Sequence, residues 1–176
     1  MTLSVVDPTT PEPRAGVEQT LGLGEWAVSA DPSATLTCIG LGSCVAFIVY
    51  DPATKVGGMA HMVLPDSTGA RNTPGTAKFV DMAIPLVIEG VEALGAQTRR
   101  LRIVLAGGAT MLRGAAFEGR INIGDRNADA ARSLLTARHL RIAAEDLGGT
   151  QGRTVRLRLV DGSISVSLAG QPARLL

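Results

Sequence analysis

Runs of apolar residues, broken by short polar turns, divide most of the chain into strand-forming segments. The clearest run is 45–50, six consecutive apolar residues rich in β-branched and aromatic types. Such a run predicts a strand buried on both faces of a sheet. Weaker patterns predict strands at 24–29, 35–39, 59–64, 101–106, 140–145, 155–160 and 164–168. The Asp161-Gly162 pair between the last two segments predicts a β-hairpin.

Two segments instead carry apolar residues at helical spacing. Residues 76–94 repeat them every three or four positions, which predicts a helix with one buried face. A second helix is expected to begin at Asp125 or Asn127 and to run to about Arg138. Many strands with two main helices predict an α/β or α+β layered domain, in which the helices cover sheet faces.

The first twenty residues differ from the rest. They carry Asp7-Pro8, Pro11 and Pro13, several threonines and few apolar side chains. We therefore expect residues 1–20 to form a mobile N-terminal tail, followed by a single domain over 21–176. The whole length of 176 residues fits one domain.

Composition narrows the functional classes. The net charge of +1 does not indicate nucleic-acid binding. No apolar stretch approaches the length of a membrane span, so we expect no membrane insertion. Two cysteines are too few for a secreted disulfide framework, and the start of the chain lacks the pattern of a signal peptide. We therefore expect a cytoplasmic protein whose thiols stay reduced.

The turn that precedes the run at 45–50 carries the chemistry. Its sequence is Gly40-Leu41-Gly42-Ser43-Cys44. A catalytic thiol has to be reachable and partly ionised, and main-chain amides aimed at the sulfur favour the thiolate. The small residues Gly40, Gly42 and Ser43 leave such amides accessible, and the same amides can stabilise an oxyanion. Cys44 is therefore the candidate nucleophile.

The chain offers two histidines as a base for this thiol. His61 lies on the strand expected after that of Cys44, and antiparallel pairing of the two would bring His61 near Cys44 at the sheet end. His139 lies between a helix and a strand beside two arginines, as a surface residue would. The plainer interpretation is that Cys44 is an inert buried thiol and His61 a structural residue.

Two further interpretations of the cysteines are less favoured. A zinc site built from Cys38, Cys44, His61 and His139 lacks the paired short spacing of zinc ligands. A disulfide between Cys38 and Cys44 is disfavoured in a reducing compartment. We expect neither a metal nor a cofactor.

Several motifs, taken in order, resemble one known family, the chemoreceptor glutamine deamidases (CheD). Around the candidate site, the motifs are Gly42-Ser43-Cys44-Val45, Tyr50-Asp51-Pro52 and His61-Met62-Val63-Leu64-Pro65. Further motifs are Gly24-Glu25-Trp26-Ala27-Val28, Lys55-Val56-Gly57-Gly58-Met59, Ala106-Gly107-Gly108-Ala109-Thr110-Met111, Asn122-Ile123-Gly124-Asp125-Arg126-Asn127 and Ala144-Glu145-Asp146-Leu147-Gly148-Gly149.

The resemblance implies a three-layer α/β sandwich of mixed sheets, similar to bacterial toxin deamidases. It also implies hydrolysis of glutamine side chains on methyl-accepting chemotaxis receptors to glutamate, a protein-glutamine glutaminase activity that passes through a cysteine thioester. Some members also hydrolyse receptor methyl esters, and some bind a chemotaxis phosphatase of the CheC type. The alternative is a non-catalytic module that docks such a phosphatase or a receptor.

Carried over by residue, the resemblance makes Cys44 the nucleophile and His61 the general base. The third catalytic residue of the family is a threonine six positions before the cysteine, where this chain has Cys38. Either a bulge presents the neighbouring Thr37, or Cys38 fills the place as a weaker donor. Substrate selection is expected in loops such as 66–75 and 110–120.

Overall fold

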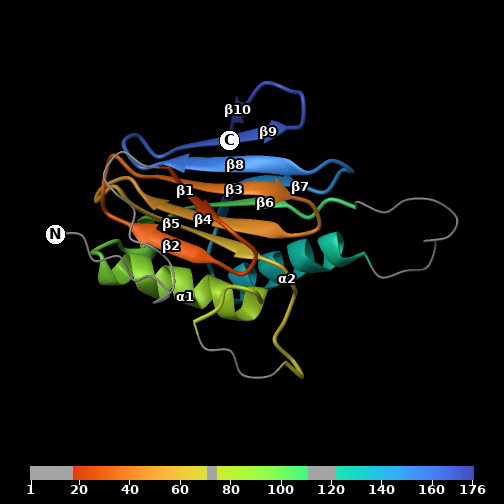
Figure 1. The fold of residues 1–176 in the computed structure, drawn as a ribbon. Helices are drawn as coiled ribbons and strands as arrows, with labels where there is room; N and C mark the ends of the chain where they lie inside the picture. The colour runs from red at the N-terminus through yellow and green to blue at the C-terminus, as the bar shows by residue number, and fades with distance from the viewer. Residues whose placement is uncertain (1–17, 71–74, 111–121) are drawn as a thin grey trace, which may run out of the picture.

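The computed structural model describes residues 18–70, 75–110 and 122–176, which form two five-stranded sheets and a layer of helices (Figure 1). The outer sheet has the order β1 (Glu18–Leu21), β3 (Thr35–Leu41), β8 (Arg153–Arg158), β9 (Ser163–Leu168) and β10 (Arg174–Leu175). The central sheet has the order β2 (Trp26–Ser29), β5 (Val56–Met62), β4 (Val45–Asp51), β6 (Arg102–Gly107) and β7 (Ile142–Leu147).

Two helices cover the face of the central sheet that points away from the outer sheet. They are α1 (Val80–Ala93) and α2 (Ile123–Ala137), and a short 3₁₀ turn, η1 (Thr98–Arg100), follows α1. Both sheets mix parallel and antiparallel pairs. The predicted three-layer α/β sandwich of mixed sheets is therefore confirmed, whereas the likeness to bacterial toxin deamidases stays a prediction.

The strand β4 is buried on both faces, as its unbroken apolar run predicts. Alternate residues such as Ala46 and Ile48 join the cluster between the two sheets. Val45 and Phe47 join the cluster between the central sheet and the helices. Burying one large aliphatic or aromatic side chain contributes roughly 1.5–3 kcal/mol, so β4 ties both cores together. The strand that follows Cys44 is thus among the most firmly held parts of the fold.

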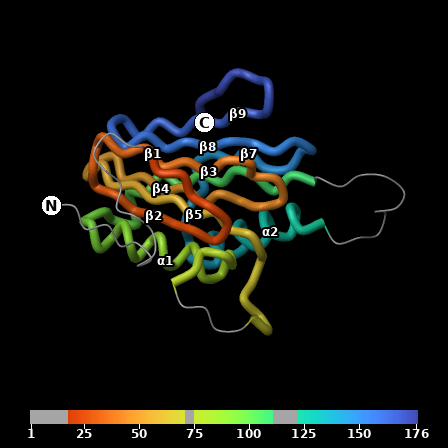
Figure 2. Tube along the Cα trace, viewed as in Figure 1, coloured from red at the N-terminus to blue at the C-terminus, as the bar shows by residue number. Residues whose placement is uncertain are grey.

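Chain order does not follow layer order. Figure 2 shows the chain leaving β1 in the outer sheet and entering β2 in the central sheet through a short turn. In this turn Gly22 donates its amide to the Glu25 carboxylate over 2.7 Å, and Gly24 donates to the main-chain oxygen of His61 over 2.9 Å. The turn therefore lies directly beside the strand that carries the candidate base.

Several boundaries differ from those that the sequence predicts. The first strand of the described residues, β1, starts at Glu18, inside the segment expected to be a tail, and residues 1–17 lie outside the described residues. The strand expected at 35–39 continues to Leu41, so the turn before Cys44 is shorter than predicted. The strands β1 and β10 and the turn η1 were not predicted.

The first helix begins at Val80, four residues later than its apolar spacing indicates. The preceding residues run beside the extension of β5 instead: Val63 and Leu64 both donate to the main-chain oxygen of Lys78. The amide of Val80 then donates to the oxygen of Leu64 over 3.0 Å. Tertiary pairing satisfies these groups, so the local helical pattern does not decide the boundary.

The second helix begins earlier than predicted, because its N-cap is Asn122 and neither Asp125 nor Asn127. The Asn122 side chain accepts hydrogen bonds from the amides of Gly124 and Asp125, a favoured use of asparagine at a helix start. Asn127 therefore lies inside the helix, fully buried. Among the described residues, no helix is both long enough and apolar enough to cross a membrane.

Candidate active site

Cys44 ends a three-residue turn, 42–44, that links β3 to β4 at the right-hand end of the sheets in Figure 1. All three carbonyl groups of the turn are held by hydrogen bonds. The oxygen of Gly42 accepts from the amide of Ala109, and that of Cys44 accepts from the amide of Gly108, both over 2.8 Å. The oxygen of Ser43 accepts from Nδ2 of Asn127 over 2.9 Å. The turn is thus fixed from the side of β6 and α2.

Two glycines allow this close packing. Gly107 has a φ angle of +124°, and a Cβ atom there would lie 2.1 Å from the main-chain oxygen of Cys44. A Cβ atom on Gly124 would lie 2.5 Å from the oxygen of Gly108. Neither distance is compatible with a side chain, so both positions need glycine. The main-chain position of Cys44 therefore depends on two glycines that lie far from it in sequence.

His61 lies on β5, the antiparallel neighbour of β4, as predicted. Its Cα partner on β4 is Ala46, two residues after Cys44. Because side chains alternate along a strand, Cys44 and Ala46 share a face, and both pack against the cluster between the sheets. Cys44 is then the diagonal cross-strand neighbour of His61, at a separation of about 7–8 Å between Cα atoms that longer side chains can bridge.

The imidazole ring of His61 is held in one tautomer. It is 3% exposed, and its Nδ1 lies 3.2 Å from the main-chain oxygen of Leu21. A carbonyl oxygen only accepts hydrogen bonds, so Nδ1 carries the proton and Nε2 of the neutral ring is bare. Nε2 is buried and has no hydrogen-bond partner among the described residues. It is therefore available to take a proton from a neighbouring thiol.

The surroundings of the His61 ring favour its neutral form. Burial lowers the pKa of His61, while the bond to Leu21 and the charge of Glu25 act in the opposite direction. Burial disfavours the charged form of an imidazole, which explains the direction. A neutral ring is the form that a general base needs.

The Cys44 thiol is half-buried, and its surroundings shift its pKa. Burial raises the pKa of Cys44, although the residue's own amide N–H, directed at the sulfur, lowers it in part. Both the ordinary thiol pKa and the direction of this shift favour the protonated form of Cys44 at neutral pH. Burial thus favours the uncharged form of both the Cys44 thiol and the His61 imidazole.

Neither candidate for the third residue has its hydrogen bond with His61. Thr37 points to the outer face of the outer sheet, where its hydroxyl donates to the Glu18 carboxylate. Cys38 points inward, with its sulfur 3.4 Å from Sδ of Met59, and burial raises its pKa. The irregularity in β3 falls between Cys38 and Leu41, after both residues, so it does not turn Thr37 inward. The main-chain oxygen of Leu21 takes the place at Nδ1 instead.

Gly40 is separated from the turn by Leu41 and is exposed. A Cβ atom on Gly40 would meet nothing within 4 Å. Of the three residues expected to frame an oxyanion, only Gly42 and Ser43 belong to the turn of Cys44. The predicted contribution of Gly40 to an oxyanion site has no contact in this structure that supports it.

The side chains weighed for a zinc site, which the sequence already disfavoured, do not gather as metal ligands. His139 is exposed just beyond the end of α2, as expected for a surface residue. No three His, Cys, Asp or Glu side chains gather as a metal site would need within 18–70, 75–110 and 122–176. Both cysteines are free thiols.

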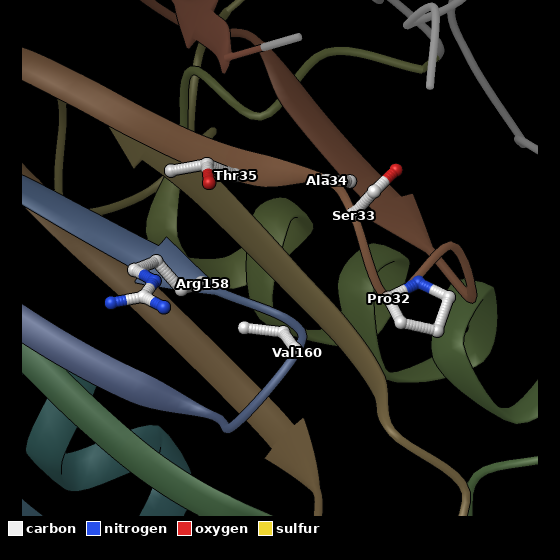
Figure 3. A pocket seen from close by; sticks show the side chains of 6 residues that line it. All are labelled: Pro32, Ser33, Ala34, Thr35, Arg158 and Val160. Carbon is white, nitrogen blue, oxygen red and sulfur yellow. The ribbon is translucent and has the colours of Figure 1, made fainter. Parts of the chain in front are cut away.

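A surface hollow lies away from these residues (Figure 3). It is lined by Thr35 and Arg158 at the opposite end of β3, together with Pro32, Ser33, Ala34 and Val160. It contains neither Cys44 nor His61; the Ser33 hydroxyl donates to the Asp31 carboxylate over 2.7 Å, and Arg158 lies 3.6 Å from Asp161. The hollow is therefore not the candidate active site.

Comparison with known proteins assigns the family. A family model described as CheD chemotactic sensory transduction matches residues 63–168. A "Probable chemoreceptor glutamine deamidase CheD" from Desulforamulus reducens is 39% identical over 163 residues, which are 93% of this chain and 98% of the relative. The "Chemoreceptor glutamine deamidase CheD" from Thermotoga maritima is 39% identical over 155 residues, 88% of this chain and 94% of the relative. The chain belongs to the CheD family.

The CheD match extends over both halves of the site. The segment matched by the family, 63–168, begins after Cys44 and His61 but covers Gly107, Gly124 and Asn127. A further CheD relative, from Archaeoglobus fulgidus, is 41% identical over 86% of this chain and 93% of its own length. This match spans 151 of the 176 residues, so wherever it starts it includes the strands next to Cys44 and that of His61.

Sequence reasoning missed two groups at this CheD site. Leu21 acts through its main-chain oxygen, which no side-chain pattern can reveal. Asn127 donates from Nδ2 to the oxygens of Ser43 and Val63, each over 2.9 Å. A polar residue among the small buried residues Gly124, Ala128 and Ala131 of α2 was the available signal. It was instead interpreted as a helix start.

Proposed function

We propose that this chain is a protein-glutamine deamidase that hydrolyses glutamine side chains of chemoreceptors to glutamate, with Cys44 as nucleophile and His61 as general base. The observation that carries the proposal is the bare, buried Nε2 of His61 on the strand beside that of Cys44. The names of the relatives, chemoreceptor glutamine deamidases, supply the substrate.

The reaction begins with proton transfer from the Cys44 thiol to Nε2 of His61. The sulfur attacks the glutamine carboxamide carbon, and the carbonyl oxygen becomes an oxyanion. Main-chain amides of the turn 42–44 are the donors proposed for this oxyanion. The carbonyl groups of the turn are bonded toward β6 and α2, and this leaves its amides to face the other way. One such donor contributes roughly 2.7–4 kcal/mol where it has been removed in other enzymes.

The tetrahedral intermediate then collapses. Protonated His61 gives its proton to the amide nitrogen, ammonia leaves, and a thioester remains on Cys44. Neutral His61 next takes a proton from water, which attacks the thioester and releases the glutamate side chain and the thiol. General acid–base help of this kind contributes about 10²–10⁴-fold. The sequence of steps needs no metal or cofactor.

The neutral resting pair supports a concerted start to this reaction. A thiol whose pKa is raised by burial reacts slowly unless a base accepts its proton during attack. The tautomer fixed by Leu21 directs the lone pair of His61 away from the main chain, as this base function requires. Hydrolysis of receptor methyl esters would use the same thioester, with methanol in place of ammonia as the leaving group.

The proposed substrate is the cytoplasmic helical region of methyl-accepting receptors, so the proposed compartment is the cytoplasm. A chemotaxis phosphatase of the CheC type stays a predicted partner.

Mass spectrometry of a receptor cytoplasmic fragment tests the proposal. After incubation with the protein, selected glutamines should gain the mass difference between an amide and an acid, and ammonia should appear in equal amount. Cys44→Ala should abolish both signals. Cys38→Ala is the matched control, since it removes the other thiol of the chain. Glutamate formation that persists in Cys44→Ala would refute the proposal, and binding of the fragment without conversion would favour the docking module.

A further inference from the structure

We propose that Asn127 is a positioning residue that sets the geometry of Cys44 relative to His61. The inference rests on the proposed function, since it concerns the same reaction. It starts from one side chain that bridges the two segments carrying the catalytic pair. The helix α2 lies across the central sheet with its first turns near the site end (Figure 1).

The first contact orients the peptide group of the nucleophile. The oxygen of Ser43, which accepts from Asn127, belongs to the same peptide plane as the amide N–H of Cys44. In a trans peptide these two groups point in opposite directions, and the described chain contains no cis peptide bond. Holding the oxygen toward α2 therefore turns the N–H away from α2. That N–H is the one directed at the Cys44 sulfur.

The second contact holds the strand of the base. The oxygen of Val63 accepts from the same Nδ2 over 2.9 Å, two residues beyond His61. Cys44 precedes the ladder between β4 and β5, whose last pair is Val45 with Met62. No ladder pair therefore joins the turn of Cys44 to residue 63. Asn127 spans this gap and joins the two segments.

The burial of Asn127 is costly for the fold. The side chain is 0% exposed, and its Oδ1 has no hydrogen-bond partner among the described residues. A buried acceptor without a partner lowers the stability of the folded protein, because the group has lost its hydrogen bonds to water. An apolar residue would avoid this cost, but it would donate neither bond. What the asparagine provides in return is a fixed position for the two oxygens that it bonds, those of Ser43 and Val63.

The position of Asn127 is itself well defined. Asn122 caps the helix and fixes where α2 begins. Gly124 lets the first turn pack against the segment after β6, with a hypothetical Cβ only 2.7 Å from the oxygen of Ala109. The small residues Ala128 and Ala131 are buried against the sheet. The donor is therefore carried on a rigid element, as accurate positioning requires.

Three variants test the inference by steady-state kinetics on a receptor fragment. Asn127→Leu keeps a buried side chain of similar size but removes both bonds. We expect a fall in kcat of about 10²-fold with little change in KM, because small misplacements of reacting groups have that effect. Asn127→Ser retains one donor and should lose less. Leu135→Ala, buried farther along α2 and bonded to neither segment, is the control and should lower stability without lowering kcat of the folded protein.

A second readout separates this inference from the proposed function. The rate of Cys44 alkylation by iodoacetamide is measured against pH, with the labelled site identified by mass spectrometry. Loss of the fixed Cys44 N–H should move the profile to higher pH in Asn127→Leu, less in Asn127→Ser and not in Leu135→Ala. If the wild type releases no ammonia, the proposed function fails, and the alkylation profiles still test Asn127. Wild-type kcat and an unshifted profile in Asn127→Leu, or in Asn127→Ser should the first variant not fold, would overturn the inference.

Discussion

The main-chain oxygen of Leu21 lies 3.2 Å from Nδ1 of His61 and joins two sheets at the candidate site. Leu21 ends β1 in the outer sheet, whereas His61 lies on β5 in the central sheet. In many cysteine and serine hydrolases a side chain orients the base. Here a carbonyl group meets that need, so the tautomer of His61 depends on the packing of the two sheets. No substitution of the Leu21 side chain removes the acceptor itself.

His61→Asn should separate orientation from catalysis. Asparagine is short, and its amide can occupy the region of Nδ1 and donate to Leu21, but it offers no base in place of Nε2. We expect the fold to persist and the rate of ammonia release to fall by about 10²–10⁴-fold. Thermal unfolding, measured beside ammonia release, verifies that the variant is folded. A folded variant with wild-type activity would remove His61 from the mechanism.

Cys38→Ala and Thr37→Val should both retain activity, because neither side chain contacts His61. Cys38→Ala loses a buried thiol against Met59, at a cost of about 1 kcal/mol. Thr37→Val loses the hydrogen bond to Glu18, at a cost of about 0.5–1.5 kcal/mol. Urea unfolding measures these costs, and ammonia release measures the activity. A large loss of kcat in one folded variant would identify that residue as the third member of the site.

The raised pKa of Cys44 predicts slow alkylation of the resting protein. The ordinary thiol pKa is about 8.5, and burial moves that of Cys44 upward. The rate of labelling at Cys44 should therefore still be rising at pH 9, and at pH 7 it should lie below that of free cysteine. Cys44→Ala serves as the control for labelling elsewhere. A rate that is already constant below pH 7 would show a pre-formed thiolate.

The lowered pKa of His61 predicts a loss of stability in mild acid. Above the unfolded value of about 6.5, His61 is neutral in both states and contributes no pH dependence. Below it, the unfolded chain binds a proton that the folded protein does not, so the free energy of unfolding falls as pH decreases toward the folded pKa. Urea unfolding at pH 7 and pH 5 should show a larger decrease in wild type than in His61→Asn. Equal decreases would mean that the buried ring is protonated when folded.

Gly107→Ala should disturb Cys44 directly, since the added Cβ would lie 2.1 Å from the Cys44 oxygen. Gly148→Ala is the matched control: its φ angle is also positive, at +80°, but a Cβ there meets nothing within 4 Å. Gly148→Ala should lower the free energy of unfolding by about 1–2 kcal/mol, from backbone strain alone. Gly107→Ala should cost more and should also reduce ammonia release, with both effects measured on purified protein. Equal effects of the two substitutions would contradict the close approach of Gly107.

The layers of the fold and the strands β4 and β5 could be predicted from sequence because their apolar patterns are strong. The run of β4 and the pairing of β4 with β5 follow from consecutive strand signals, and they bring His61 near Cys44. Helix boundaries were less accurate, since the residues before Val80 pair with residues 63–64 and this contact overrides a local pattern. Of the loops expected to set specificity, 66–75 falls partly and 110–120 almost entirely outside the described residues.

The parts of the site that could not be predicted are those made by long-range main-chain contacts. Leu21 reaches His61 across 40 positions of the sequence, and Asn127 reaches Ser43 across 84. Contacts between residues so far apart in sequence leave no repeating pattern of apolar and polar positions that could predict them. The direction of the Cys44 pKa shift could not be predicted either, because the cost of burying a charged sulfur depends on how deeply the turn packs, and the small residues around it do not reveal that depth.

The burial of β4 on both faces has a consequence for how this enzyme family can diversify. Amides of such a core strand exchange with solvent mainly when the whole domain opens, so local fluctuations should leave the start of β4, directly after Cys44, in place. Substitutions that alter which receptor segment is accepted should then cost the least folding stability in the loops between helices and strands, where they leave both cores intact. Substrate choice can evolve there while Cys44 and His61 keep their positions.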